Sequence, residues 1–189
     1  RDSGTPCIKY NGIQIVKELR SALPNNKIMA DLKTMDAGLY EAKPFYEAGA
    51  DIVTVLGAAD SGTISGVIKA SEHRDRAWAQ VDLINVQDKI AATRLAFSLG
   101  AHVIGIHTGL DQQAAGQTPF LDLKSVAYLR HPRMPFKISV AGGINKETVT
   151  MAIGAGADIV VVGAAIYGAD DPVQAAKEIK HAVDRVANV

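Results

Sequence analysis

The sequence predicts a parallel α/β fold, and three observations lead to this prediction. Short runs of β-branched and aliphatic residues recur along the 189 residues, and a helical pattern separates each run from the next. The runs are apolar almost throughout, as expected for strands of a parallel sheet covered on both faces. No glycine-rich dinucleotide fingerprint follows any run, which disfavours an open doubly wound sheet. The predicted architecture is therefore a (β/α)8 TIM barrel.

Three segments of the sequence have the same pattern of residues. They are "AGADIVTVLG" (48–57), "LGAHVIGIHTG" (99–109) and "AGADIVVVGAA" (155–165). In each, a glycine ends a helical pattern, a small residue follows, and an apolar run begins. The glycine suits a helix C-cap, where φ is often positive. We therefore expect each segment to join the end of a helix to a buried strand.

Six strands and seven helices are expected in alternation. The strands are 27–30, 52–56, 78–84, 103–106, 136–141 and 159–162. The helices are 12–23, 40–48, 62–73, 88–99, 121–130, 145–155 and 171–187. The last helix has the clearest pattern, because Asp170, Asp171 and Pro172 suit an N-cap and a first turn.

The count falls short of a whole barrel, which has eight strands and usually about 250 residues. The shortfall is expected at the front, because residues 1–12 read as a loop and the chain begins with Arg1 rather than Met. We therefore expect a single barrel domain over residues 1–189. We expect it to lack the first strand, the first helix and most of the second strand.

The composition excludes several classes of function. Basic and acidic residues both number 20, so the sequence has no excess of positive charge that would favour binding to nucleic acid or an anionic membrane. Aromatic residues make up only 5%, which also disfavours stacking on nucleic-acid bases. No apolar run approaches the length of a membrane span. The single cysteine, Cys7, cannot form an internal disulfide, which fits a reducing cytoplasm. Cys7 has no base at a known spacing and is expected to be inert.

Charged residues follow the first predicted strand. Asp31, Lys33 and Asp36 come directly after an apolar run. Because Asp31 and Lys33 are two residues apart, both are expected to face the barrel mouth, where a lysine could pair with a developing oxyanion. Asp82 ends a later strand, and with Asp31 it could hold a divalent cation. The alternative is a buried salt-bridge network that orders the barrel rim.

His107 is the candidate for proton transfer. It follows an apolar run, Asp111 lies four residues further on, and Lys33 is expected nearby. The alternative is a structural histidine. The polar segment 112–119 after it could cover a substrate or simply be solvated. The other histidines are expected on the surface: His73, His102, His131 and His181.

The last two predicted strands end in small residues, Gly142-Gly143 and Gly163-Ala164, each before a helix. Backbone amides at such turns can bind an anion, and a phosphate site after the last two strands recurs in barrels. The alternative is that these residues only make tight turns.

"DLKTMDAG" resembles the D-x-K-x-x-D signature of the orotidine 5′-monophosphate decarboxylase suprafamily. Together with "TVLG", "VDLINV", "HTGLDQQAAGQTPF", "VAGGI" and "VVGAAIYG", it is similar to the 3-hexulose-6-phosphate synthase family within it. The resemblance implies an aldehyde-lyase of the ribulose monophosphate pathway. This enzyme condenses formaldehyde with D-ribulose 5-phosphate to D-arabino-hex-3-ulose 6-phosphate through an enediolate that Mg²⁺ stabilises.

The resemblance also implies roles for individual residues. It places the catalytic set at His107, Lys33, Asp36 and Asp82, with His107 carrying the proton at C1 of the sugar. It places the metal ligands at Asp31 and Asp2. It places phosphate binding at Gly142, Gly143, Gly163 and Ala164. Finally, it implies a homodimer in which Asp36 reaches the active site of the partner subunit.

Two alternatives stay open. One is a decarboxylase or epimerase acting on a sugar phosphate, such as the decarboxylase of 3-keto-L-gulonate 6-phosphate. That enzyme resembles this chain but has Arg at Ala164 and Glu at Asp82, so both positions favour the synthase. The other alternative is an inactive, truncated barrel, because Asp2 stands where the family has a longer Glu ligand.

Overall fold

The computed structural model of the protein describes the backbone of residues 2–187 and the side chains of residues 4–186. The chain divides into two compact units, Arg1–Ile104 and Gly105–Val189. Strands alternate with helices in both units, and the paired strands of each unit are parallel. The predicted α/β class is therefore confirmed, whereas the extent of the domain stays a prediction.

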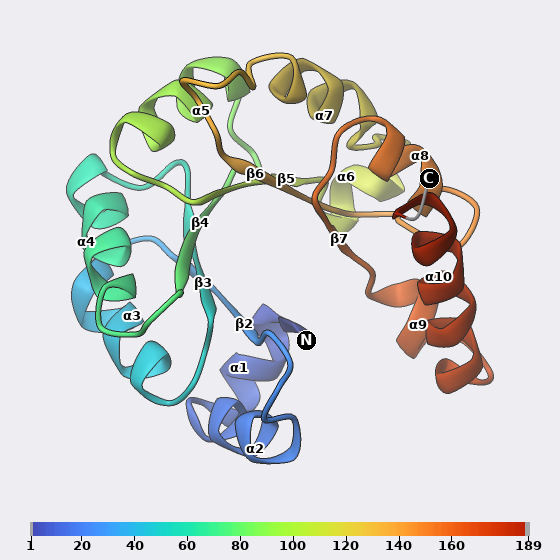
Figure 1. Cartoon of the computed structure of the whole chain (residues 1–189), viewed down its shortest axis with the longest axis horizontal. Coiled ribbons are helices and arrows are strands. Elements are labelled where there is room, and N and C mark those ends of the chain that lie inside the picture. The colour runs from blue at the N-terminus through green and yellow to red at the C-terminus, as the bar shows by residue number, and fades with distance from the viewer. Residues whose placement is uncertain (1, 188–189) are drawn as a thin grey trace. The chain divides into compact units, whose positions relative to one another are not determined.

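The first unit is built on four parallel strands, each paired with the next (Figure 1). They are β1 (Asp2–Ser3), β2 (Met29–Thr34), β3 (Ile52–Leu56) and β4 (Trp78–Asp82). β3 and β4 stay in register from Ile52 and Trp78 to Leu56 and Asp82. Successive residues of β3 and β4 are buried, so both faces of these strands are covered, as the continuous apolar runs predict.

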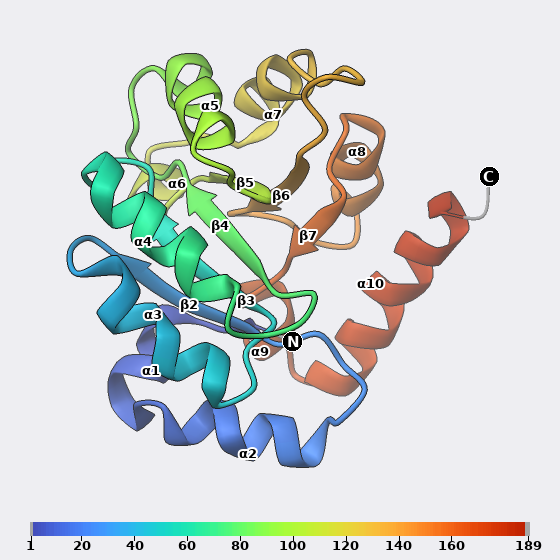
Figure 2. The ribbon, with the colours of Figure 1, turned by 60° about the vertical axis from the view of Figure 1, so that its left-hand side comes forward.

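Five helices belong to this unit: α1 (Thr5–Asn11), α2 (Gln14–Ala22), α3 (Gly38–Glu47), α4 (Ser61–Ser71) and α5 (Lys89–Ser98). Figure 2 shows α3 and α4 running side by side. Two glycines permit this close approach. A Cβ atom on Gly38 would lie 2.0 Å from the Thr63 carbonyl oxygen, and one on Gly66 would lie 2.8 Å from the Leu39 nitrogen.

The prediction of a loop over residues 1–12 was wrong, because this segment contains β1 and α1. Pro6 stands at the start of α1, where its missing N–H group is not needed. Gly12, with φ of +62°, ends the helix. The helix is only seven residues long and buries Ile8, so its apolar periodicity was too weak to recognise.

β5 (Val103–His107) carries the chain into the second unit. There, β6 (Lys137–Ala141) pairs in parallel with β7 (Ile159–Val161). The helices are α6 (Leu110–Ala114), α7 (Phe120–Ala127), α8 (Val149–Gly154), α9 (Ala164–Tyr167) and α10 (Pro172–Ala187). α6 and α9 were not predicted, because five and four residues are too few to show a helical period.

The three repeated segments share two structural features, a glycine with positive φ and a side chain that accepts a backbone N–H. Their glycines, Gly49, Gly100 and Gly156, have φ values of +112°, +97° and +109°, which confirms the predicted C-caps. Two residues after each glycine, a side chain accepts a backbone N–H from the start of the preceding strand or from the residue just before it. The acceptors are Asp51, His102 and Asp158, and the donors are Ile28, Ala79 and Ile138, at 2.8, 3.1 and 2.8 Å. His102, predicted on the surface, is half-buried, and its ring has this structural contact.

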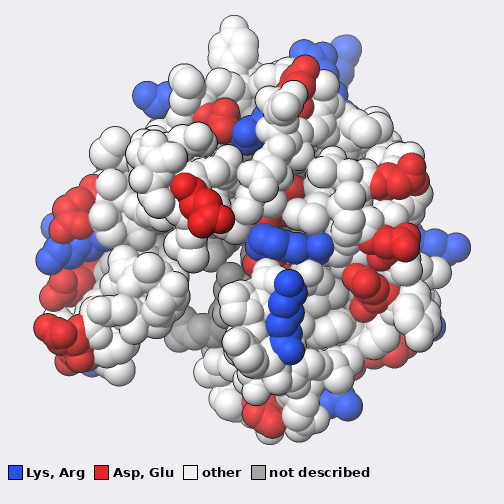
Figure 3. Space-filling model, turned by 180° about the vertical axis from the view of Figure 1, so that it is seen from behind, with Lys and Arg blue, Asp and Glu red and all other residues white. Residues whose placement is uncertain are grey.

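The surface carries charges of both signs. On the face seen in Figure 3, acidic and basic side chains lie interspersed. Within the described part of the chain, no helix has both the length and the apolar character needed to cross a membrane.

Candidate active site

Asp31 and Lys33 lie inside β2, in an irregular stretch of the strand. Ala30 pairs with Val53 and Thr34 pairs with Val55, so β2 advances four residues where β3 advances two. Within this bulge, Lys33 has φ of +51°, a left-handed conformation that is uncommon for a residue with a side chain. The strand was predicted to end at Ala30, but β2 continues to Thr34 and includes both residues. The two side chains were predicted to share a face by strand alternation, whereas the structure brings them into contact within the bulge.

The ammonium group of Lys33 lies between two carboxylates. Its Nζ atom is 2.5 Å from Asp31 Oδ2 and 3.5 Å from Asp82 Oδ2. Asp82 is almost completely buried at the end of β4, and its Oδ1 atom accepts the Ile84 backbone N–H at 2.9 Å. We call Asp31, Lys33 and Asp82 the charged cluster.

Burial and attraction oppose each other in the charged cluster. Burial alone would raise the pKa of Asp31, but the charge of Lys33 and the hydrogen bonds from Lys33, Thr54 and Thr5 hold that pKa below its ordinary value. Burial alone would lower the pKa of Lys33, but Asp31 and Asp82 hold it above its ordinary value. Asp31 and Lys33 are therefore both charged at neutral pH, so Lys33 can stabilise negative charge but cannot serve as a base.

Two threonine hydroxyls complete the surroundings of Asp31, and sequence reasoning missed both. Thr54 Oγ1 donates to Asp31 Oδ1 at 2.7 Å and accepts the Lys33 backbone N–H at 2.9 Å. Thr5 Oγ1 lies 2.9 Å from Asp31 Oδ2 and 3.3 Å from Lys33 Nζ. The available signal for Thr54 was its hydroxyl in the otherwise apolar run "IVTVL".

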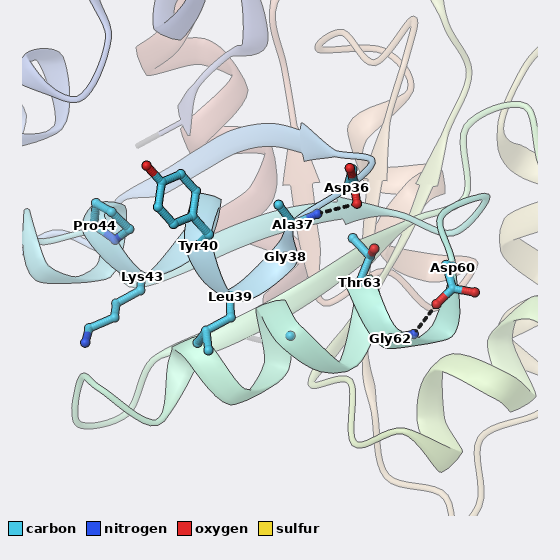
Figure 4. A pocket seen from close by; sticks show the side chains of 11 residues that line it. Asp36, Ala37, Gly38, Leu39, Tyr40, Lys43, Pro44, Asp60, Gly62 and Thr63 are labelled. Atoms are coloured by element: carbon cyan, nitrogen blue, oxygen red, sulfur yellow. Dashed lines mark hydrogen bonds between the residues drawn. The ribbon is translucent and has the colours of Figure 1, made fainter.

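Asp36 lies beyond β2, and its hydrogen bond is not to the charged cluster. It is exposed, and its Oδ1 atom accepts the Ala37 backbone N–H at 2.7 Å. Asp36 and Asp60 both line an open groove of about 860 Å³ along α3 and α4 (Figure 4). The groove also presents apolar side chains, of which Leu39 is 38% and Tyr40 84% exposed. Asp60 has a structural task as well, because it caps α4 by accepting the Gly62 N–H.

His107 is the last residue of β5 and is half-buried, in the second unit. Asp111 is exposed in the first turn of α6. The segment 112–119 is not a simple solvated loop, because its first residues belong to α6. Gln113 Nε2 donates to the carbonyl oxygen of Thr108 at 2.8 Å and so ties this segment to the end of β5.

The four candidate phosphate-binding residues differ in their surroundings. A Cβ atom on Gly142 would lie 2.2 Å from the Thr108 carbonyl oxygen, so packing alone requires glycine there. Gly143, with φ of +69°, is exposed after β6. Gly163 and Ala164 are exposed where α9 begins after β7. The backbone of Gly143, Gly163 and Ala164 is therefore accessible to a ligand, whereas Gly142 has a structural explanation.

The donors near Lys33 suit a hard cation only in part. Among the described residues, no group of three or more His, Cys, Asp or Glu side chains is placed to hold a metal ion. Asp31 and Asp82 supply carboxylate oxygens, and Mg²⁺ is commonly held by one or two carboxylates together with substrate oxygens. The backbone of Asp2 pairs with Met29, but the side chain of Asp2 lies outside the described part of the structure. The donor chemistry would therefore fit an Mg²⁺ ion only where substrate oxygens complete its coordination.

Parallel strands alternate with helices, and the charged cluster lies on β2 and at the end of β4. The fold and this cluster define an α/β protein with a candidate site on its sheet. Residues 3–179 match the model of the Orotidine 5′-phosphate decarboxylase / HUMPS family, and the chain belongs to this family.

Individual proteins and solved structures similar to this chain include two synthases and one KGPDC. A 3-hexulose-6-phosphate synthase of Methylomonas aminofaciens is 61% identical over 176 residues, which are 93% of this chain and 82% of that protein. The crystal structure of 3-hexulose-6-phosphate synthase from Salmonella typhimurium has a TM-score of 0.92 at 38% identity, covering 98% of this chain and 86% of that one. A crystal structure of KGPDC from Streptococcus mutans has a TM-score of 0.87 at 28% identity, covering 98% of this chain and 85% of that one.

Proposed function

We propose that the protein condenses formaldehyde with D-ribulose 5-phosphate to give D-arabino-hex-3-ulose 6-phosphate. The observation that carries this proposal is the 61% identity to a 3-hexulose-6-phosphate synthase over 93% of the chain. The charged cluster supports it, because an aldol reaction develops negative charge on sugar oxygens and the Lys33 ammonium is fixed and positive. The 28% identity to KGPDC is a weaker reason to choose decarboxylation.

The reaction needs one proton removed and one proton supplied. The C1–H bond of the pentulose breaks, its electron pair forms the bond to the formaldehyde carbon, and the formaldehyde oxygen takes up a proton. We assign the transfer at C1 to His107, because imidazole is the side chain best suited to proton transfer near neutral pH. Its position at the carboxyl end of β5 supports this assignment.

We propose that Mg²⁺ takes part, held by Asp31, by substrate oxygens and by Asp2 as a second carboxylate. When bound, Mg²⁺ supplies positive charge beside oxygens that become negative. The task of the chain's own residues is to orient the Asp31 carboxylate, which Thr54, Thr5 and Lys33 hold through both of its oxygens.

We assign the substrate phosphate to the backbone after β6 and β7, at Gly143, Gly163 and Ala164. The support is that these residues are exposed and that glycine lets an anion approach the backbone closely. The assignment of Gly142 as a fourth member has less support, because the Thr108 carbonyl oxygen already explains that glycine.

We also propose a homodimer in which the groove along α3 and α4 receives a second copy of the chain. The exposed apolar surfaces of Leu39 and Tyr40 favour burial by a partner. In this arrangement, Asp36 acts in the active site of the partner.

Within the α/β class, we propose that the fold is the (β/α)8 barrel, supported by the TM-score of 0.92 to a solved synthase.

The test is an assay that follows loss of ribulose 5-phosphate with and without formaldehyde, each in the presence and absence of Mg²⁺. We expect consumption only when formaldehyde and Mg²⁺ are both present, and a phosphorylated hexulose as the product. Consumption that ignores formaldehyde would contradict the synthase and favour an isomerase or epimerase. Loss of CO₂ from 3-keto-L-gulonate 6-phosphate would favour the decarboxylase.

A further inference from the structure

We propose that Thr54 is a positioning residue whose hydroxyl holds Lys33 in its left-handed conformation and thereby fixes the ammonium group between Asp31 and Asp82. The kinetic consequence of this inference rests on the proposed function. The geometry that suggests it does not, because it involves only residues of the first unit.

The first reason is the conformation of Lys33. A φ of +51° is disfavoured for a lysine and persists only when its surroundings enforce it. In a regular parallel pair, a backbone N–H of β2 would donate to a carbonyl group of β3. In the bulge, the Lys33 N–H instead donates to Thr54 Oγ1 at 2.9 Å. The hydroxyl therefore replaces the ladder partner that the bulge removes.

The second reason is the direction of the hydrogen bonds. A hydroxyl has one hydrogen to donate and can accept at the same time. Thr54 Oγ1 accepts the Lys33 backbone N–H through a lone pair. Its own hydrogen stays available and is donated to Asp31 Oδ1, 2.7 Å away. The side chain of Lys33 closes the ring at Asp31 Oδ2, at 2.5 Å. Both ends of Lys33 are thus tied to one carboxylate, and Thr54 is the link on the backbone side.

The third reason is the burial of Thr54. Thr54 is 1% exposed, and its neighbours in β3, Val53 and Val55, are fully buried. Valine would fill the same position with almost the same shape, so packing alone does not call for a hydroxyl. A buried hydroxyl is unfavourable unless it is hydrogen-bonded, and here both bonds go to the charged cluster and its backbone. We infer that the hydroxyl, rather than the shape of the side chain, is what this position supplies.

The experiment compares Thr54→Val, which removes the hydroxyl, with Thr54→Ser, which keeps it. For Thr54→Val we expect kcat to fall about 10- to 100-fold with KM for ribulose 5-phosphate within about threefold, because the reacting groups are misplaced by a fraction of an ångström to an ångström. For Thr54→Ser we expect kcat within about threefold of the wild type. The control is Thr93→Val, which removes another buried hydroxyl, one bonded to the Lys89 carbonyl in α5. It should leave kcat unchanged.

A second measurement separates this inference from the proposed function. In a crystal structure of Thr54→Val, we expect Lys33 to leave the left-handed region and its Nζ atom to leave Asp31, whereas Thr54→Ser keeps both. If Lys33 stays in place in Thr54→Val, the inference is overturned, whatever the enzyme catalyses. If the wild type shows no formaldehyde-dependent turnover, the proposed function fails, and this structural comparison still decides the role of Thr54. Should Thr54→Val not fold, Thr54→Ser and Thr54→Ala form a second pair that differs only in the hydroxyl.

Discussion

Asp51 and Asp158 occupy the same structural position in the two units. Each carboxylate accepts the backbone N–H of an isoleucine in the preceding segment at 2.8 Å, and each pairs with an arginine. Arg20 reaches Asp51 at 2.5 Å and Arg130 reaches Asp158 at 2.7 Å. Each arginine also donates to the carbonyl group of the glycine that ends a helix. The repeated "AGAD" of the sequence therefore stabilises the fold through these ion pairs and hydrogen bonds, and it has no catalytic role.

Asp51→Asn should lower the free energy of unfolding by about 3 kcal/mol, because it leaves the partly buried guanidinium of Arg20 without its counter-charge. Urea denaturation measures this change. The control is Asp75→Asn, which breaks the exposed pair with Arg76 and should cost less than about 0.5 kcal/mol. Equal effects of the two substitutions would contradict a special role for Asp51.

Stability should fall in acid, and Asp51 should account for part of the loss. Burial alone would raise the pKa of Asp51, but the Ile28 N–H and the guanidinium groups of Arg20 and Arg74 hold it below its ordinary value of 3.8. A lowered pKa contributes stability above the ordinary value, and this contribution is lost as the pH falls through the folded pKa. The melting temperature, followed from pH 7 down to about 2.5, should therefore drop below about pH 4. The drop should be shallower in Asp51→Asn, and a drop of unchanged depth would exclude Asp51 as a cause.

His107→Ala should slow exchange of the C1 proton of ribulose 5-phosphate by about 100-fold or more, because it removes the proposed proton carrier. Loss of the C1 proton signal in deuterated buffer without formaldehyde measures the exchange by NMR. His181→Ala, at an exposed position on α10, is the control and should exchange like the wild type. Exchange that survives in His107→Ala would mean that another group is the base.

Asp36→Ala and His107→Ala should rescue each other when the two inactive proteins are mixed and allowed to exchange subunits. If Asp36 acts in the partner's active site, one site of each mixed dimer contains both wild-type residues. An equal, random mixture should then recover about a quarter of the wild-type activity. If Asp36 acts in its own subunit, every site lacks one residue, and the mixture should stay inactive.

Asp31→Asn should weaken the dependence on Mg²⁺, because it removes a charged oxygen ligand from the proposed metal site. A titration of activity against Mg²⁺ should show a midpoint about 10- to 100-fold higher than in the wild type. Asp122→Asn changes a carboxylate in the first turn of α7 and serves as the control. A midpoint that does not move in Asp31→Asn would refute Asp31 as a ligand.

The sequence predicted the long elements well and the short ones poorly. All six expected strands exist, because each contains an apolar run set off from a recognisable helical pattern. The bounds of β2 were wrong, since the strand expected at 27–30 covers Met29–Thr34. β1, α1, α6 and α9 were missed, because a few residues do not establish a period. The half-burial of His102 and its acceptance of the Ala79 N–H were not predicted, because that contact comes from a neighbouring strand and nothing local indicates it.

The sequence indicated the three residues of the charged cluster, but not the geometry in which they meet. The sequence alone identified Asp31, Lys33 and Asp82, because charges at the ends of apolar strands need partners or a task. It also determined the parallel α/β class and the family, because periodicity and motif are local and repeated. The tertiary structure alone decided the bulge in β2, the left-handed Lys33 and the hydrogen bonds of Thr54. These depend on a hydroxyl 21 residues from Lys33 and 23 from Asp31, which meets them only when β3 folds against β2.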